Sequence, residues 1–211
     1  YRSAANVQLA DLALVRGDWP EAERYARIAL DFNRHNLSAL DVLAIVGRKT
    51  NRQATAREAA AALDALDPLH HLLRAERYLA TPTPAALASL TGAMRSEFPE
   101  QAILELAIGY DRRGLRDDAV KLLDAVGTRV THPIVRAWRA YLRQDAAALG
   151  AAPDVRMVFP FRPETVPVLA WAAAARPHWT WTYLHALNLW ALDRPDEALQ
   201  LLRPLGTTPD F

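Results

Sequence analysis

The chain contains no cysteine among its 211 residues. This absence excludes disulfide bonds, thiolate metal sites and cysteine nucleophiles. Lysine is almost absent too, because Lys49 and Lys121 are the two lysines and the other strongly basic residues are arginines. A chain so poor in lysine and so rich in alanine is typical of a GC-rich genome, and we expect a bacterial source.

The chain also lacks an excess of charge and a long apolar run. Lys and Arg number 25 against 24 for Asp and Glu, so no net field attracts nucleic acid, and we expect no nucleic-acid partner. Apolar stretches such as 166–175 are too short to span a bilayer, so we expect no membrane partner. No secretory signal opens the chain, which favours the cytoplasm. Because the chain begins at Tyr1 without Met, we expect a piece of a longer protein.

Motifs of known catalytic chemistry are missing as well. The sequence has no Gly-x-Ser-x-Gly, no phosphate-binding glycine loop and no His-Glu-x-x-His. Histidines are not spaced to supply three metal ligands, and we expect His70 and His71 to cap a helix or lie at the surface. The acidic pair Asp117-Asp118 falls in the first turn of a helix, where carboxylates favour the helix dipole. We therefore expect no catalytic residue, no metal and no cofactor, in a chain that is not itself an enzyme.

What is present is a repeated helical hairpin. Residues 17–22 (Gly-Asp-Trp-Pro-Glu-Ala) and 114–119 (Gly-Leu-Arg-Asp-Asp-Ala) share a Gly-to-Ala spacing between two helix-like runs, and 193–198 repeats it with Asp in place of Gly. When the hairpins are aligned on these alanines, Ala22 and Ala56 lie 34 residues apart. One hairpin cannot bury its apolar face alone, so we expect the hairpins to stack.

Two aspartates are candidate helix caps at the turns. Asp18 can cap a helix whose third position is Glu21, and Asp193 is a similar candidate before Pro195. Thr83 precedes Pro84, a residue favoured in the first turn of a helix.

This spacing resembles the tetratricopeptide repeat family, whose period is about 34 residues. The family's small residue in the first helix, its closing proline and its aromatic residue match Ala10, Ala44, Ala75, Ala107, Ala186, Pro68, Pro99, Tyr78 and Tyr110. The resemblance implies an all-α, right-handed α-solenoid of helical hairpins with an irregular insertion near 151–162. We expect helices near 3–16, 19–33, 37–48, 53–66, 69–80, 84–96, 100–113, 116–126, 133–143, 145–150, 163–175, 178–192 and 195–204.

The C-terminal third departs from the plain repeat. Residues 159–165 (Phe-Pro-Phe-Arg-Pro-Glu-Thr) lead into 168–171 (Val-Leu-Ala-Trp) and then His178-Trp179. This combination resembles the C-terminal repeat region of large bacterial proteins that also carry an uncharacterised galactose-mutarotase-like β-sandwich domain. The resemblance implies a helical appendage of a carbohydrate-handling protein and transfers no catalytic residue. We expect repeats over 1–150, and the insertion plus a C-terminal hairpin of the same solenoid over 151–211.

Aromatic residues concentrate near the C-terminus, where four of the six tryptophans lie. Aromatic faces stack on sugar rings or anchor peptides. The candidate ligand- or partner-binding residues are Phe159, Phe161, Trp171, Trp179, Tyr183 and Trp190. Trp179, Tyr183 and Trp190 follow the three-to-four spacing of one helix face. The alternative is that these residues pack the last hairpin against the insertion, as most helical aromatic stripes do.

The first helix of each hairpin is expected to line a concave wall. On this wall Arg48 matches the cations with which some modules of the family clamp a carboxylate, whereas Asp11, Asp41 and Asp111 would repel one. We therefore expect a non-catalytic scaffold that docks a protein partner or other domains of the same polypeptide. The alternative is an accessory domain of a carbohydrate-active enzyme, with a glycan as the partner of the aromatic surface.

Overall fold

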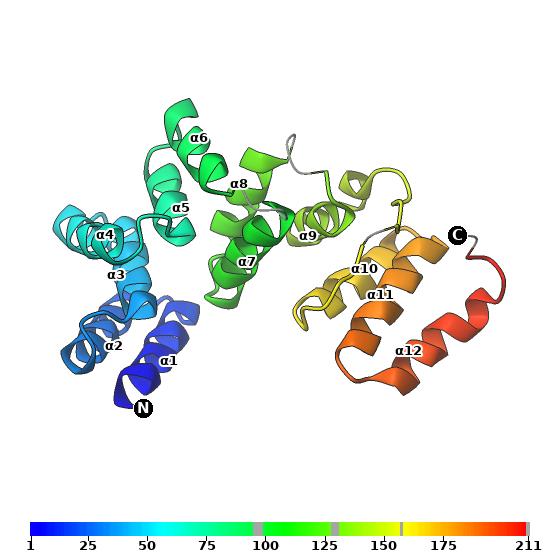
Figure 1. The fold of residues 1–211 in the computed structure, drawn as a ribbon, viewed down its shortest axis with the longest axis horizontal. Helices are drawn as coiled ribbons and strands as arrows, with labels where there is room; N and C mark the ends of the chain where they lie inside the picture. The colour runs from blue at the N-terminus through cyan, green and yellow to red at the C-terminus, as the bar shows by residue number, and fades with distance from the viewer. Residues whose placement is uncertain (95–98, 128–130, 157, 210–211) are drawn as a thin grey trace. The chain divides into compact units, whose positions relative to one another are not determined.

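The computed structural model describes residues 1–94, 99–127, 131–156 and 158–209. These residues form helices and their connections, with no β-strand among them, which confirms the predicted all-α fold of helical hairpins (Figure 1). The chain divides into two compact units, Tyr1–Ala125 and Val126–Phe211.

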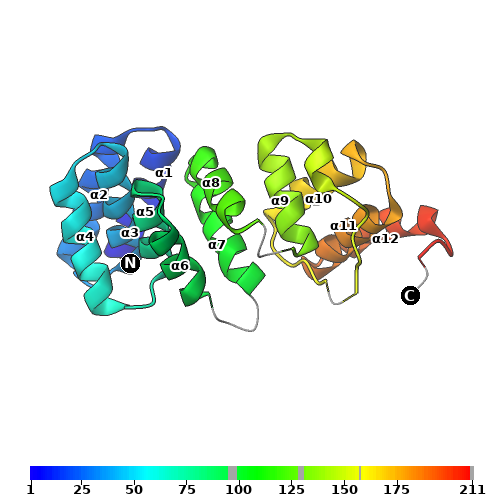
Figure 2. The ribbon, with the colours of Figure 1, turned by 90° about the horizontal axis from the view of Figure 1, so that it is seen from above.

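The first unit is a series of helical hairpins. Its helices are α1 (Arg2–Val15), α2 (Trp19–Phe32), α3 (Leu37–Lys49), α4 (Gln53–Leu66), α5 (His71–Ala80), α6 (Pro84–Ala93), α7 (Pro99–Arg112) and α8 (Arg116–Val126). In the first three hairpins each odd-numbered helix packs against the helix that follows it, and α3 also packs against α1, α2 and α5 (Figure 2). Helix α3 therefore lies at the centre of this unit and is its most buried helix.

The turns that follow α1, α3 and α7, and one turn of the second unit, share one backbone geometry. In each, the residue two positions after the end of the first helix has a positive φ: Gly17 (71°), Asn51 (55°), Gly114 (73°) and, in the second unit, Asp193 (57°). The next amide N–H then donates to the carbonyl five residues back, in the pairs Asp18–Ala13, Arg52–Gly47, Leu115–Tyr110 and Arg194–Leu189. This bond and the left-handed residue define a Schellman turn. Asn and Asp tolerate the left-handed region better than other non-glycine residues, so Asn51 and Asp193 replace glycine there.

Side-chain caps begin several helices where the sequence places them. The Asp18 carboxylate accepts a hydrogen bond from the Glu21 N–H at 3.1 Å, and the Thr83 hydroxyl accepts one from the Ala86 N–H at 3.1 Å. The expectation that Asp193 caps the last hairpin's second helix is wrong, because this residue ends the preceding helix in the left-handed conformation instead.

Small residues bring the helices close together. The alanines predicted to face the neighbouring helix are all buried: Ala10, Ala44, Ala75, Ala107 and Ala186. Two helices approach closely at Gly47 of α3, where an added Cβ would lie 2.6 Å from the backbone nitrogen of Ala56 in α4. A side chain of any kind at Gly47 would therefore push the two helices apart.

The second unit contains α9 (Pro133–Arg143), α10 (Thr165–Ala175), α11 (Trp179–Ala191) and α12 (Pro195–Leu202). Trp138 and Trp181 are buried in its core, and the Trp138 Nε1–H donates to the Thr165 hydroxyl at 3.1 Å. The buried Asn188 donates from Nδ2 to the Arg162 carbonyl at 3.1 Å, which ties α11 to the segment preceding α10.

Some predicted helices differ from the observed ones. The helix expected at 145–150 is a short 3₁₀ helix, Ala146–Leu149, and the one expected at 195–204 changes to a 3₁₀ helix at Arg203–Leu205. Helix α5 begins two residues later than expected, because Asp67 folds the preceding residues into a turn by accepting the Leu69 N–H at 3.0 Å. The described residues of 151–162 contain no helix, as predicted, whereas 95–96 of the helix expected at 84–96 lie outside the described residues.

Candidate functional site

A network of buried charges joins three hairpins of the first unit. Arg48 of α3 places Nε 2.7 Å from a Glu76 carboxylate oxygen and Nη2 2.8 Å from Asp118. Lys49 Nζ lies 2.7 Å from the same Asp118 oxygen, and the Tyr110 hydroxyl donates to Glu76 at 2.6 Å. Arg48, which matches the carboxylate-clamping cations of some modules of the family, is thus occupied by two carboxylates of its own chain.

The protonation states fit a structural role for this network. Burial by itself would raise the pKa of Asp118, but hydrogen bonds from Arg48 and Lys49 outweigh that effect and hold the pKa below its ordinary value. Burial and then the nearby Glu76 carboxylate raise the pKa of Tyr110 well above its ordinary value, so the hydroxyl stays a donor. Removing one partner of a buried pair costs about 3–5 kcal/mol, because the other charge stays buried.

Two further carboxylates of the expected concave wall are also paired. Asp11 of α1 accepts a hydrogen bond from Arg113 Nε at 2.8 Å, which joins the first hairpin to the α7–α8 turn. Asp41 of α3 lies 2.6 Å from His70 Nε2. Val7 of α1 and Ile45 of α3 are buried as well. The inner side of the first unit is therefore held together by its own side chains.

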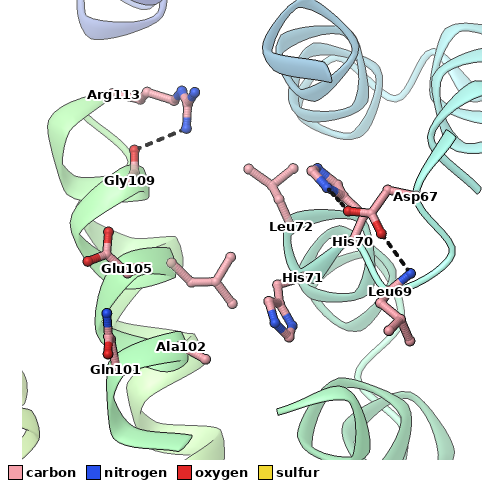
Figure 3. A pocket seen from close by; sticks show the side chains of 11 residues that line it. Asp67, Leu69, His70, His71, Leu72, Gln101, Ala102, Glu105, Gly109 and Arg113 are labelled. Atoms are coloured by element: carbon pink, nitrogen blue, oxygen red, sulfur yellow. Dashed lines mark hydrogen bonds and ion pairs between the residues drawn. The ribbon is translucent and has the colours of Figure 1, made fainter. Parts of the chain in front are cut away.

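A groove remains between α5 and α7 (Figure 3), and we call it the α5–α7 groove. Its volume is about 620 Å³, within the range of ligand pockets. Residues 69–72 line one wall, with Asp67 at the end, and Gln101, Ala102, Glu105, Leu106, Gly109 and Arg113 line the other. Leu72 and Leu106 are largely buried, and Leu69 is 65% exposed at the edge. The groove thus combines apolar side chains with polar ones along its edges.

The pKa values of the two histidines of the groove shift in opposite directions. The hydrogen bond to Asp41 raises the pKa of His70 above its ordinary value. Burial, followed by the positive charges of His70 and Arg74, lowers the pKa of His71. At neutral pH His71 is therefore an uncharged imidazole that can donate one hydrogen bond and accept another.

Gly109 leaves a stretch of bare backbone in the groove wall. An added Cβ at this position would meet only Arg113 Nη1, at 3.6 Å, so packing does not require glycine here as it does at Gly47. A glycine inside a helix costs about 1 kcal/mol relative to alanine. Its effect is to keep the groove wide and to let a ligand approach the α7 backbone closely.

In the second unit, three of the predicted site residues pack against other rings. Trp179 and Tyr183 lie one turn apart on α11, with ring centroids 6.2 Å apart in an edge-to-face arrangement. Trp171 of α10 packs instead against Tyr141 of α9, with a centroid distance of 5.8 Å. The three are partly buried, so each contributes to packing as well as to the surface.

The other three predicted site residues are exposed. Phe159 is 72% exposed, Phe161 50% and Trp190 53%. No ring contact within the described residues joins any of them to another predicted site residue. The buried core of this unit is formed by other tryptophans, Trp138 and Trp181.

The described part of the chain contains no group of three His, Asp or Glu that could hold a metal ion. Asp41 and Asp67 approach opposite ring nitrogens of His70, so their oxygens do not converge on one point. None of the described helices is long and apolar enough to cross a bilayer.

The ion pairs among the wall residues were not predicted from the sequence, although the spacing of their charges is regular. Asp41 and Arg48 lie seven residues apart on one face of α3, and His70 and Glu76 lie six apart around the next first helix. Complementary charges at nearly equal spacing on neighbouring first helices permit two parallel ion pairs, but the spacing does not say which helix faces meet. Asp118 gave no such signal, because its position in a first turn already explains a carboxylate.

Comparisons with known proteins add the following. No family model and no curated protein sequence match the chain. Among solved structures, PilW, a widely conserved type IV pilus biogenesis factor, is 15% identical with a TM-score of 0.42, covering 96% of this chain and 91% of PilW. A tetratricopeptide repeat protein from Parabacteroides merdae ATCC 43184 is 11% identical with a TM-score of 0.37, covering 100% of this chain and 81% of its own. At these values the likenesses say nothing of function.

Proposed function

We propose that this chain is a non-catalytic helical-repeat scaffold that holds a polypeptide segment in the α5–α7 groove. The segment belongs to a protein partner or to another domain of the same, longer bacterial protein. The observation that carries the proposal is the groove itself, with Leu72 and Leu106 as apolar contacts and the bare α7 backbone at Gly109.

The chemistry of the groove suits an extended peptide. Apolar side chains receive a ligand side chain, while the amide of Gln101 and the neutral imidazole of His71 offer both donors and acceptors to a peptide backbone. The paired charges around the groove support the non-catalytic part of the proposal. Arg113 is engaged by Asp11, and His70 is engaged by Asp41.

The test is selection from random peptides displayed on phage, using the purified chain as bait. Gly109→Leu fills the groove wall and is expected to weaken binding of the selected peptides by about tenfold or more. Gly92→Leu is the matched control, because Gly92 is a helical glycine with nothing within 4 Å of an added Cβ. Failure to enrich any sequence, or equal binding by the Gly109→Leu and Gly92→Leu variants, would contradict a peptide groove.

A second candidate is an accessory domain of a carbohydrate-handling protein, as the resemblance from Phe159 onward implies. The exposure of Phe159, Phe161 and Trp190 favours it, because exposed aromatic faces stack on sugar rings. Titration with a glycan panel, followed by tryptophan fluorescence, tests it. A response that is lost in Trp190→Ala while the helical content is kept would support glycan contact, and an absence of response across the panel would count against it.

A further inference from the structure

His70 stands between two carboxylates at the end of the α5–α7 groove. Its Nε2 lies 2.6 Å from Asp41 Oδ1, and its Nδ1 lies 3.3 Å from Asp67 Oδ2. Figure 3 shows the contact with Asp67, which lines the groove end together with Leu69 and His70. One imidazole ring thus connects α3, through Asp41, with the connection between α4 and α5.

The two contacts determine how many protons the His70 ring must carry. Both acceptors are carboxylate oxygens, so both ring nitrogens must donate. A neutral imidazole carries a single N–H, and only the imidazolium carries two. The arrangement is therefore that of a protonated ring, and removal of one proton must break one of the two hydrogen bonds.

The bond that breaks is the one to Asp67. The contact with Asp41 is shorter and its carboxylate is largely buried, whereas the Asp67 side chain is 42% exposed and can be hydrated instead. Asp67 also accepts the Leu69 N–H through Oδ1, at 3.0 Å, so the same carboxylate holds the turn that forms the groove end. Once its contact with His70 is lost, this turn keeps its local bonds and the hydrogen bond from Arg74 Nη2 to the Pro68 carbonyl, at 2.7 Å, but loses its connection through His70 to α3.

We propose that His70 is a proton-operated latch that fixes the end of the α5–α7 groove when its ring is charged and releases it when the ring is neutral. A role of this latch in regulating peptide binding rests on the proposed function, but the opening of the latch can be measured without a ligand. The charged and titratable groups that face His70 or the groove beside it are Asp41 of α3, Asp67, His71 and Arg74 of α5, and Glu105 and Arg113 of α7.

The direction of the pH dependence follows from these groups. The hydrogen bond to Asp41 outweighs burial, so the pKa of His70 is raised above its ordinary value of 6.5. The latch is therefore complete below that value and opens as the pH rises through the folded-state pKa. His71 has a lowered pKa and gains its proton only in more acidic solution, so it does not titrate in the same window.

The experiment is hydrogen-exchange mass spectrometry on the whole chain at pH 6 and pH 9, with each rate corrected for the intrinsic effect of pH. The amides of residues 69–72 are expected to lose protection by about two- to tenfold at pH 9, the factor that one hydrogen bond contributes. NMR titration of the His70 ring should give a pKa above its ordinary value.

Asp67→Asn is the informative variant, because Asn still accepts the Leu69 N–H but its Nδ2 cannot accept a proton from His70. It should remove the pH dependence of exchange at 69–72 and lower the pKa of His70. The matched control is Asp64→Asn, an exposed carboxylate of α4 that pairs with Arg77. Equal protection of the wild type at both pH values, or equal behaviour of the two variants, would overturn the latch. A groove that binds no peptide would leave these exchange results unchanged, so the two failures are distinguishable.

Discussion

The substitution Gly47→Ala should destabilise the first unit, although it improves helix propensity. Alanine gains about 1 kcal/mol over glycine inside a helix. Against this, the new methyl group would lie 2.6 Å from the Ala56 nitrogen and 2.8 Å from its Cα and Cβ. Overpacking typically costs about 1–3 kcal/mol, and backbone atoms cannot rotate away, so the upper end applies. We expect a net loss of about 2 kcal/mol.

Gly109→Ala is the matched control with the opposite sign. The same methyl group gains the same helix propensity, but its nearest neighbour is the end of the flexible Arg113 side chain at 3.6 Å. This variant should be more stable than the wild type by about 0.5–1 kcal/mol. The two substitutions are chemically identical, so the difference in their effects isolates the helix–helix contact at Gly47.

Equilibrium urea unfolding followed by circular dichroism measures both effects, with hydrogen exchange assigning the transition of the first unit. With a denaturant slope of about 2 kcal/mol/M, the midpoint of Gly47→Ala should fall by about 1 M. That of Gly109→Ala should rise by about 0.3–0.5 M. A Gly47→Ala midpoint equal to or above that of the wild type would refute the reasoning, because it would show that α3 and α4 can move apart at little cost.

Three further predictions concern buried charge, aromatic residues and a turn. Asp118→Asn should cost the first unit about 3 kcal/mol in urea unfolding, because it removes the buried carboxylate charge that pairs with both Arg48 and Lys49. Asp117→Asn, at the exposed neighbouring residue, should change stability by less than about 0.5 kcal/mol. Trp181→Ala should destabilise the second unit by about 3–5 kcal/mol and Trp190→Ala by less than about 1 kcal/mol, and comparable losses would show that Trp190 belongs to the core. Asp193→Gly should stabilise the second unit by up to about 1 kcal/mol, seen as a small rise in the thermal midpoint, because glycine adopts the left-handed conformation at lower energy. A fall in the midpoint would mean that the Asp side chain contributes more than its backbone strain costs.

The hairpin frame could be predicted from the sequence because its determinants are local. A left-handed turn residue such as Gly17 or Gly114, a small residue facing the next helix and a capping side chain such as Asp18 all act within one hairpin. The prediction failed where a residue has two local roles open to it. Asp193 could begin α12 or end α11, and the left-handed turn prevailed.

The groove and the ion-pair network could not be predicted in the same way. Arg48 meets Glu76 across 28 positions and Asp118 across 70, and the meeting depends on how the hairpins curve. Repeat spacing predicts which face a residue occupies but not which distant face it meets. The role of His70 was missed for the same reason, since its partner Asp41 lies 29 positions away.

The bond between Arg48 and Asp118 has a consequence for how this repeat could change in evolution. In an ideal array each hairpin contacts only its neighbours, so a repeat can be gained or lost and the rest adjusts. Here an ion pair joins the second hairpin to the fourth, and the ion pair of Asp11 joins the first hairpin to the fourth as well. Deleting one complete period of 34 residues would leave each remaining hairpin intact but would separate the residues that form these ion pairs. The first unit therefore behaves as one cooperative module that tolerates substitution in its turns and resists a change in its number of repeats.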